Sequence, residues 1–207
     1  MNSRVALRRL CARFSHNQAT GTVVPDPRRP HLFYHLVQPP TPLAPASDVF
    51  ALSFLSQSPP NAESSAILGW IPAPRSASSL SPEQLEQQLS WREFPSFKEV
   101  LHKSIYASLR DQKDEFWLNG AKQLQEGWMH IHDQRNPPAL GRIGDPDDII
   151  ASVLVEKGVV QPETYQPMPS YRVCTADGVL QLTPQLLQDL IEALQRVTEG
   201  EQASVNP

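Results

Sequence analysis

Proline placement constrains the fold of this chain more than any other feature of its sequence. The 207 residues include 21 prolines, which is about twice the usual share of roughly 5%. Proline fixes φ and lacks a backbone donor, so it is excluded from helix interiors and central strands. Prolines gather at 39–45, 59–60 and 72–74, between apolar segments. These positions predict short elements joined by extended loops.

Strand and hairpin signals occur at both ends of the chain. The first three apolar segments are separated by short proline-containing loops, which favours antiparallel neighbours. Asp177-Gly178 is a two-residue hairpin signal. The predicted strands are 31–37, 48–55, 65–71, 128–133, 171–175 and 179–182, with 165–170 extended.

Helix signals occupy the middle and the end of the sequence. Ser81-Pro82 and Ser96 match helix starts, and Thr183-Pro184 caps a final helix that ends at Gly200. Asp145-Pro146 also resembles a helix start, and apolar residues follow it until Gly158. The predicted helices begin at Ser81, Ser96, Asp111, Asp145 and Thr183. We therefore predict an α+β fold, with an antiparallel sheet of about six strands and about four helices packed on one face.

The first 14 residues have the composition of a mitochondrial presequence. They carry four arginines and no acidic residue, and Leu7, Leu10, Cys11 and Phe14 share one face of a helix. We predict a presequence over 1–14, a disordered linker over 15–30, a single domain over 31–200 and a disordered tail over 201–207. The expected location is the mitochondrion, in the matrix.

Charge is divided unevenly along the chain. Residues 1–30 hold six arginines and one aspartate, whereas the rest holds 12 basic and 21 acidic residues. An acidic body argues against nucleic-acid binding, which needs clustered Lys and Arg. No apolar run approaches the ~20 residues that span a bilayer, so we predict no membrane span.

The two cysteines, Cys11 and Cys174, do not form a disulfide framework. Removal of the presequence would leave Cys174 alone, which fits a reducing compartment. We interpret Cys174 as a buried strand residue and not as a nucleophile.

His130-x-His132 is the most specific local motif. Residues i and i+2 of a strand share a face, so both imidazoles and Trp128 are expected to point the same way. Two imidazoles could chelate a metal only if a third ligand joined them. The available third ligands are His35, His102, Asp133 and Asp145. Packing on a half-exposed strand is the favoured interpretation, and we predict no metal and no cofactor.

Acidic and basic residues follow this strand. Asp145, Asp147 and Asp148 are interpreted as helix-capping residues, because acids suit the positive end of a helix dipole. Arg135, Arg142 and Arg172 could bind a carboxylate or phosphate, although solvated surface charge is the simpler reading. If the chain does bind a small ligand, the candidate pocket residues are Trp128, His130, His132, Arg142, Asp145 and Arg172.

Two blocks of the sequence carry a resemblance to a known family. Gly144-Asp145-Pro146-Asp147-Asp148-Ile149-Ile150-Ala151-Ser152-Val153-Leu154-Val155, continued by 164–172, resembles the C-terminal signature of an uncharacterised family of small fungal mitochondrial proteins. Tyr34-His35-Leu36 and Trp70-Ile71-Pro72 are similar to its N-terminal part. The likeness covers 31–195. It implies a mitochondrial protein with no assigned activity, so it assigns no catalytic residue.

These observations favour a non-enzymatic accessory or assembly factor of the matrix that binds an unknown protein partner. No Gly-rich phosphate loop and no complete catalytic constellation occurs in the sequence. The alternative is an enzyme or small-ligand binder with a pocket around His130, His132 and the 141–148 segment.

Overall fold

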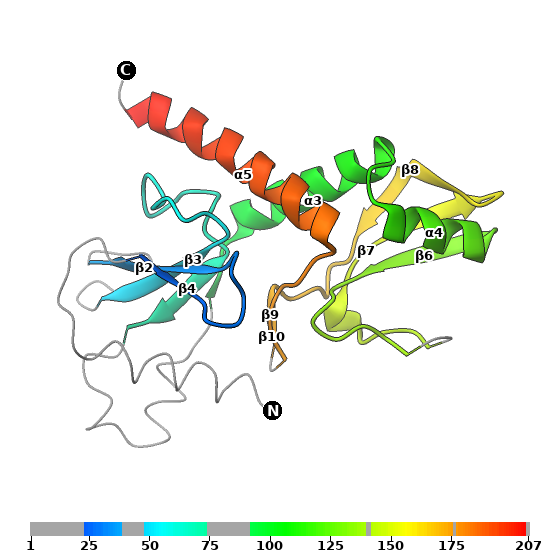
Figure 1. The fold of residues 1–207 in the computed structure, drawn as a ribbon, viewed down its shortest axis with the longest axis horizontal. Coiled ribbons are helices and arrows are strands. Elements are labelled where there is room, and N and C mark those ends of the chain that lie inside the picture. The colour runs from blue at the N-terminus through cyan, green and yellow to red at the C-terminus, as the bar shows by residue number, and fades with distance from the viewer. Residues whose placement is uncertain (1–22, 39–47, 74–91, 140–141, 176, 206–207) are drawn as a thin grey trace. The chain divides into compact units, whose positions relative to one another are not determined.

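The computed structural model describes residues 23–38, 48–73, 92–139, 142–175 and 177–205 (Figure 1). The chain forms two compact units: unit 1 comprises 1–98 with 194–207, and unit 2 comprises 99–193. The sequence patterns predict a single domain over 31–200, and the structure divides that range between the two units. The predicted presequence and the helix predicted to begin at Ser81 lie outside the described residues.

Unit 1 contains a five-stranded antiparallel sheet. Its central strand is buried along its whole length, and Trp70 on the next strand is also buried. The three strands predicted near the N-terminus are confirmed, with shifted bounds. The strands, in spatial order, are β1 (Val23–Pro25), β2 (Phe33–Val37), β3 (Val49–Ser53), β4 (Gly69–Pro72) and β5 (Arg92–Glu93).

The predicted linker and tail are both partly wrong. Residues 23–25 pair with β2, and the following turn is held by Asp26. The Asp26 carboxylate accepts hydrogen bonds from the Arg28 and Arg29 amides at 2.8 and 3.1 Å. The final helix continues through 201–205, where the Glu201 carboxylate accepts a hydrogen bond from the Ser65 amide at 2.9 Å. Local hydrogen bonding therefore orders segments whose composition indicated disorder.

Unit 2 contains a three-stranded antiparallel sheet and a short hairpin (Figure 1). The order of the sheet is β6-β7-β8, so β7 is central. The strands are β6 (Gly127–His132), β7 (Ile149–Glu156) and β8 (Val159–Pro167), and the predicted hairpin is confirmed as β9 (Cys174–Thr175) and β10 (Gly178–Val179).

The described helices are α3 (Pro95–Arg110), α4 (Glu115–Leu124) and α5 (Pro184–Val205). Asp114 caps α4, because its carboxylate accepts hydrogen bonds from the Phe116 and Trp117 amides. The helix predicted from Asp111 therefore starts four residues later. None of the described helices is long and apolar enough to cross a lipid bilayer.

The helix predicted from Asp145 is wrong. Asp145 does cap a single 3-10 turn, η1 (Pro146–Asp148), but Ile149 begins strand β7. β7 is buried on both faces between β6 and β8, and a central strand of this kind is apolar without alternation. Gly158 is not a helix end. It follows Lys157 in the β7–β8 turn, where φ is 52° and 73° at the two residues.

The α+β class with antiparallel sheets is therefore confirmed, whereas a single sheet of about six strands is wrong, and the described residues form three α-helices in place of about four. The described strands belong to sheets of five, three and two strands. The main cause of the wrong sheet prediction is the β7 segment. The sequence pattern predicted a helix there, so the strand that lies between β6 and β8 was missed.

Candidate functional site

The sheet that contains β6 has one face covered by helix α4 and one more open face. Met129 and Ile131 are buried, and Met129 lies under α4, where its sulfur would be 3.5 Å from a Cβ placed on Gly120. Trp128 points to the other face and keeps 47% of its surface exposed. The strand predicted over 128–133 is thus confirmed. Trp128 is a large aromatic side chain that the fold leaves in solvent.

His130 is the next residue on the open face. Its Nδ1 is hydrogen-bonded to the Ser152 hydroxyl at 2.8 Å, and Ser152 is its cross-strand partner on β7. The His130 and His132 rings lie 6.0 Å apart between centroids and are steeply inclined to each other. The two imidazoles therefore share one side of the sheet, as the spacing predicts.

His132 is covered by the segment that follows β6. A Cβ placed on Gly144 would lie 2.7 Å from His132 Nδ1, so the glycine backbone packs directly on the imidazole. This Nδ1 is buried and has no hydrogen-bond partner among the described residues. Burial, followed by the proximity of His130, lowers the pKa of His132. This shift favours the neutral imidazole.

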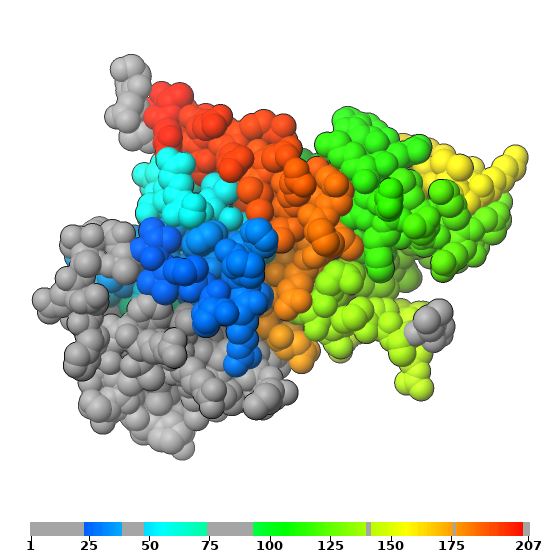
Figure 2. All heavy atoms as spheres, viewed as in Figure 1, coloured from blue at the N-terminus to red at the C-terminus, as the bar shows by residue number. Residues whose placement is uncertain are grey.

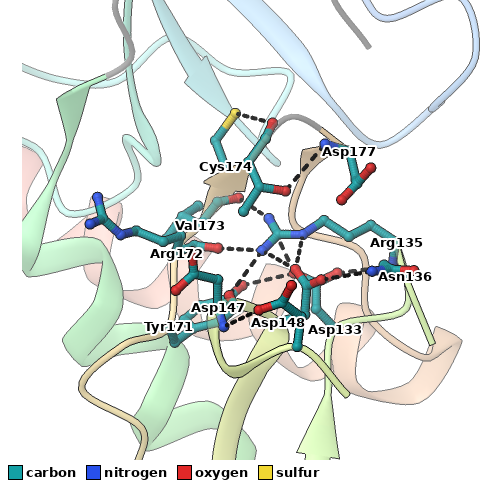
Figure 3. Close-up of polar contacts among 12 residues, drawn as sticks. Asp133, Arg135, Asn136, Asp147, Asp148, Tyr171, Arg172, Val173, Cys174 and Asp177 are labelled. Carbon is teal, nitrogen blue, oxygen red and sulfur yellow. Dashed lines mark hydrogen bonds and ion pairs between the residues drawn. The ribbon is translucent and has the colours of Figure 1, made fainter. Parts of the chain in front are cut away.

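The other three predicted pocket residues have separate local roles. The Asp145 carboxylate accepts a hydrogen bond from the Asp147 amide and caps η1. Arg142 is exposed, and its amide closes a turn with Ala139. Arg172 is exposed, and its side chain points away from the neighbouring polar contacts in Figure 3. Asp145 therefore has a capping role, and Arg142 and Arg172 are surface residues.

A buried arginine forms the largest polar network of unit 2, which we call the arginine cluster: Asp133, Arg135, Asp148 and Tyr171 (Figure 3). The Arg135 side chain is completely buried, and all of its nitrogens have partners. Nε and Nη2 bind the Asp148 carboxylate at 2.8 and 2.7 Å. The remaining contacts reach backbone carbonyls of Asp147, Arg172, Val173 and Gly178.

Asp133 completes the arginine cluster. Its carboxylate lies 3.5 Å from Arg135 Nη1 and accepts hydrogen bonds from the Tyr171 hydroxyl and from two amides, those of Arg135 and Gln181. Burial raises the pKa of Asp133, and these contacts only partly offset it. Burial opposes the charge on Arg135, but the two carboxylates and Tyr171 outweigh it and raise the pKa of Arg135.

The arginine cluster joins four segments of unit 2: the end of β6, η1, the 171–174 stretch and β10. Every donor of the Arg135 guanidinium is used within the chain, so none is left for an anionic ligand. The sequence analysis grouped Arg135 with surface arginines. The sequence pattern that could have indicated the cluster is Asp133-x-Arg135, immediately after a strand. The backbone carbonyls that accept from the Arg135 guanidinium belong to residues 12 to 43 positions away in the sequence, so the pattern alone does not reveal them.

The remaining histidines named as third metal ligands lie in other settings. His35 is buried in unit 1, and its Nε2 is hydrogen-bonded to the Leu55 carbonyl at 2.9 Å. In unit 2, His102 Nδ1 is hydrogen-bonded to the Tyr165 hydroxyl at 2.8 Å, and burial raises the pKa of Tyr165. Within the part of the chain that the structure describes, no three His, Cys, Asp or Glu side chains converge as metal ligands.

Comparison of the chain with protein-family models, curated proteins and solved structures finds no match. The geometry of the site therefore has to carry the functional argument.

Proposed function

We propose that this chain is a mitochondrial accessory protein that acts by binding a protein partner and not by catalysis. The observation that carries the proposal is Trp128, which is 47% exposed on the open face of the β6–β8 sheet. Aromatic residues of this kind dominate binding energy at protein interfaces. We place the partner-binding surface at this face, beside His130 and the half-buried Leu154, which is the cross-strand neighbour of Trp128.

The distribution of charge supports binding over chemistry. Asp133, Arg135 and Asp148 of unit 2 are buried and paired with one another. A catalytic group has to meet a substrate in a site that the substrate can enter. On the open face, His130 and the Ser152 hydroxyl form the pair that could act in catalysis, and the exposed ring of Trp128 beside them is the feature that favours partner binding.

The location is supported by the sequence. Residues 1–14 carry four arginines and no acid, and this composition is typical of a presequence. The resemblance to small fungal mitochondrial proteins agrees with it. We propose the matrix as the site of action.

Two measurements on the full chain test the proposal. Import into isolated mitochondria should yield a protein whose N-terminal sequence begins near Ser15, and an intact Met1 on the imported protein would reject matrix processing. A photo-crosslinking residue at Trp128 should give one specific protein adduct in mitochondria. The matched control is Val159, which is 50% exposed in the same unit. Equal labelling from both positions would reject Trp128 as the contact.

A small-ligand site is a second candidate, favoured by one observation. His132 Nδ1 is buried with no partner among the described residues, although buried polar atoms are usually hydrogen-bonded. A ligand or metal at His130 and His132 would supply that partner. Elemental analysis of untagged protein tests it: about one zinc, iron or manganese per chain, lost in a His130→Ala/His132→Ala variant, would favour this candidate.

A further inference from the structure

The outer edge of β6 lacks the features that protect sheet edges. Of the described strands, β6 pairs only with β7, so alternate backbone groups on its other side have no ladder partner. Gly127–His132 contains no proline, lysine, arginine, aspartate or glutamate. Natural proteins usually place such residues on an exposed edge to prevent pairing with another chain.

The opposite edge of the same sheet is protected. β8 contains Pro162 and Pro167, which cannot donate a backbone hydrogen bond, and Glu163 between them. The register of its pairing with β7 also shifts between Ser152 and Leu154. At this shift, the Thr164 hydroxyl accepts a hydrogen bond from the Leu154 amide and donates one to the Gln161 carbonyl. The sheet is therefore blocked at β8 and open at β6.

Space is available beside the open edge. The segment that follows β6, yellow-green in Figure 2, projects away from the strands and leaves an open notch between them. Trp128 on β6 is 47% exposed, and Ile143 in the segment that follows β6 is 78% exposed. Among the described residues, the Gln134 side chain donates a hydrogen bond to the His132 carbonyl at 3.1 Å, so the part of the edge that remains for a partner lies before His132.

We infer that β6 takes up an extended segment of the partner protein as a fourth strand in this notch. The inference rests on the proposed function and names the form of the partner. An extended backbone matches the alternating donors and acceptors of the edge, and this mode of recognition is common. Side chains beside Met129 and Ile131 should be apolar, because those residues belong to the buried core. Side chains on the other face would contact Trp128 and His130.

A second copy of the chain is the other occupant that an unprotected edge could pair with, and the oligomeric state of the chain tests it. The uncharged composition of β6 also gives no preference for a charged partner, so an apolar or aromatic segment is the expected occupant.

The probe is a display library of random twelve-residue peptides selected on the full chain. The best binder is then synthesised in two forms, each N-methylated at every second residue, in opposite phases. Only one phase places methyl groups against β6 if the peptide pairs as a strand. That form should lose at least about tenfold in affinity, while the other stays within about threefold. Equal sensitivity of both forms, or of neither, would overturn the inference.

Two further measurements separate the remaining outcomes. Sedimentation of the chain alone should show a monomer, and a dimer in which the β6 amides are protected from exchange would assign the edge to a second copy and overturn the inference. Binding that depends on Trp128 but shows no alternation with methylation would reject strand pairing and leave the proposed function standing. If no peptide is enriched and Trp128 cross-links nothing in mitochondria, both proposals fail.

Discussion

The arginine cluster and the open face of β6 use polar residues in opposite ways, although both belong to unit 2. In the arginine cluster, Arg135 and two carboxylates are buried and satisfy one another. On β6, Trp128 stays exposed and His130 is only half buried. The cluster joins segments that are distant in sequence, whereas the β6 surface leaves an aromatic ring in solvent.

If partner binding occurs at the β6 face as proposed, the charged residues of unit 2 are a poor guide to that surface. A buried guanidinium with every donor occupied contributes to folding and has no capacity for a ligand. An exposed aromatic residue on an unprotected edge has no comparable role in folding. The following predictions test this division, from the largest expected effect to the smallest.

Arg135→Met should destabilise the chain by about 3–5 kcal/mol, the usual cost of removing one partner from a buried ionic group. The substitution leaves the Asp133 and Asp148 carboxylates buried without their cation. Denaturant unfolding of both proteins measures the difference. Because the unpaired carboxylates become less costly when protonated, the difference should shrink as the pH is lowered.

The matched control is Arg142→Met, which removes an exposed guanidinium by the same substitution. It should change the free energy of unfolding by no more than about 0.5 kcal/mol. Similar losses for both variants would contradict the assignment of Arg135 as the residue that joins the segments of unit 2.

Gly144→Ala should cost about 1–3 kcal/mol, because the new methyl group would lie 2.7 Å from His132 Nδ1. The same variant combined with His132→Ala should recover part of the loss. Gly200→Ala is the control: a Cβ there meets nothing within 4 Å on α5, so a gain of roughly 0.5–1 kcal/mol is expected. A harmless Gly144→Ala would mean that the segment after β6 does not hold His132.

Acidification should destabilise the chain through His35 and His132. Burial lowers the pKa of both imidazoles from 6.5. Below that value the unfolded state binds protons that the folded state does not. The free energy of unfolding therefore decreases as the pH is lowered, until the pH reaches the pKa of the folded state. The raised pKa of Asp133 acts in the opposite direction. Each contribution is therefore isolated by substitution.

His132→Phe is the variant that isolates the His132 contribution. The free energy of unfolding is measured at about pH 7 and about pH 5.5 in the variant and in the unaltered chain. The loss on acidification should be smaller in the variant, and an unchanged loss would assign the pH dependence to other groups.

The sequence predicted local features well and long-range ones poorly. The strand with Trp128, His130 and His132 follows from alternation, and the Asp177-Gly178 hairpin follows from turn chemistry. The β7 strand was missed because Ile149–Val155 fits both a helical stripe and a doubly buried strand. Only its two partner strands decide between them.

The candidate site shows the same limit. The face shared by the two histidines is a consequence of strand periodicity, so it was predictable. The contact of Gly144 with His132 and the carbonyls around Arg135 depend on how distant segments fold together. No spacing rule in a single sequence encodes those contacts.

Trp128→Ala should have a small effect on stability and a large one on binding. The ring is nearly half exposed, so its loss should cost less than about 1 kcal/mol. Trp117→Ala is the matched control, since Trp117 on α4 is only 5% exposed and its truncation should cost about 3–5 kcal/mol. Denaturant unfolding gives both values, and affinity for the selected peptide gives the second readout. A binding residue loses affinity without losing stability, whereas a packing residue such as Trp117 loses stability first. If Trp128→Ala unfolds the chain as readily as Trp117→Ala does, the open face of β6 is part of the core, and its distinction from the arginine cluster disappears.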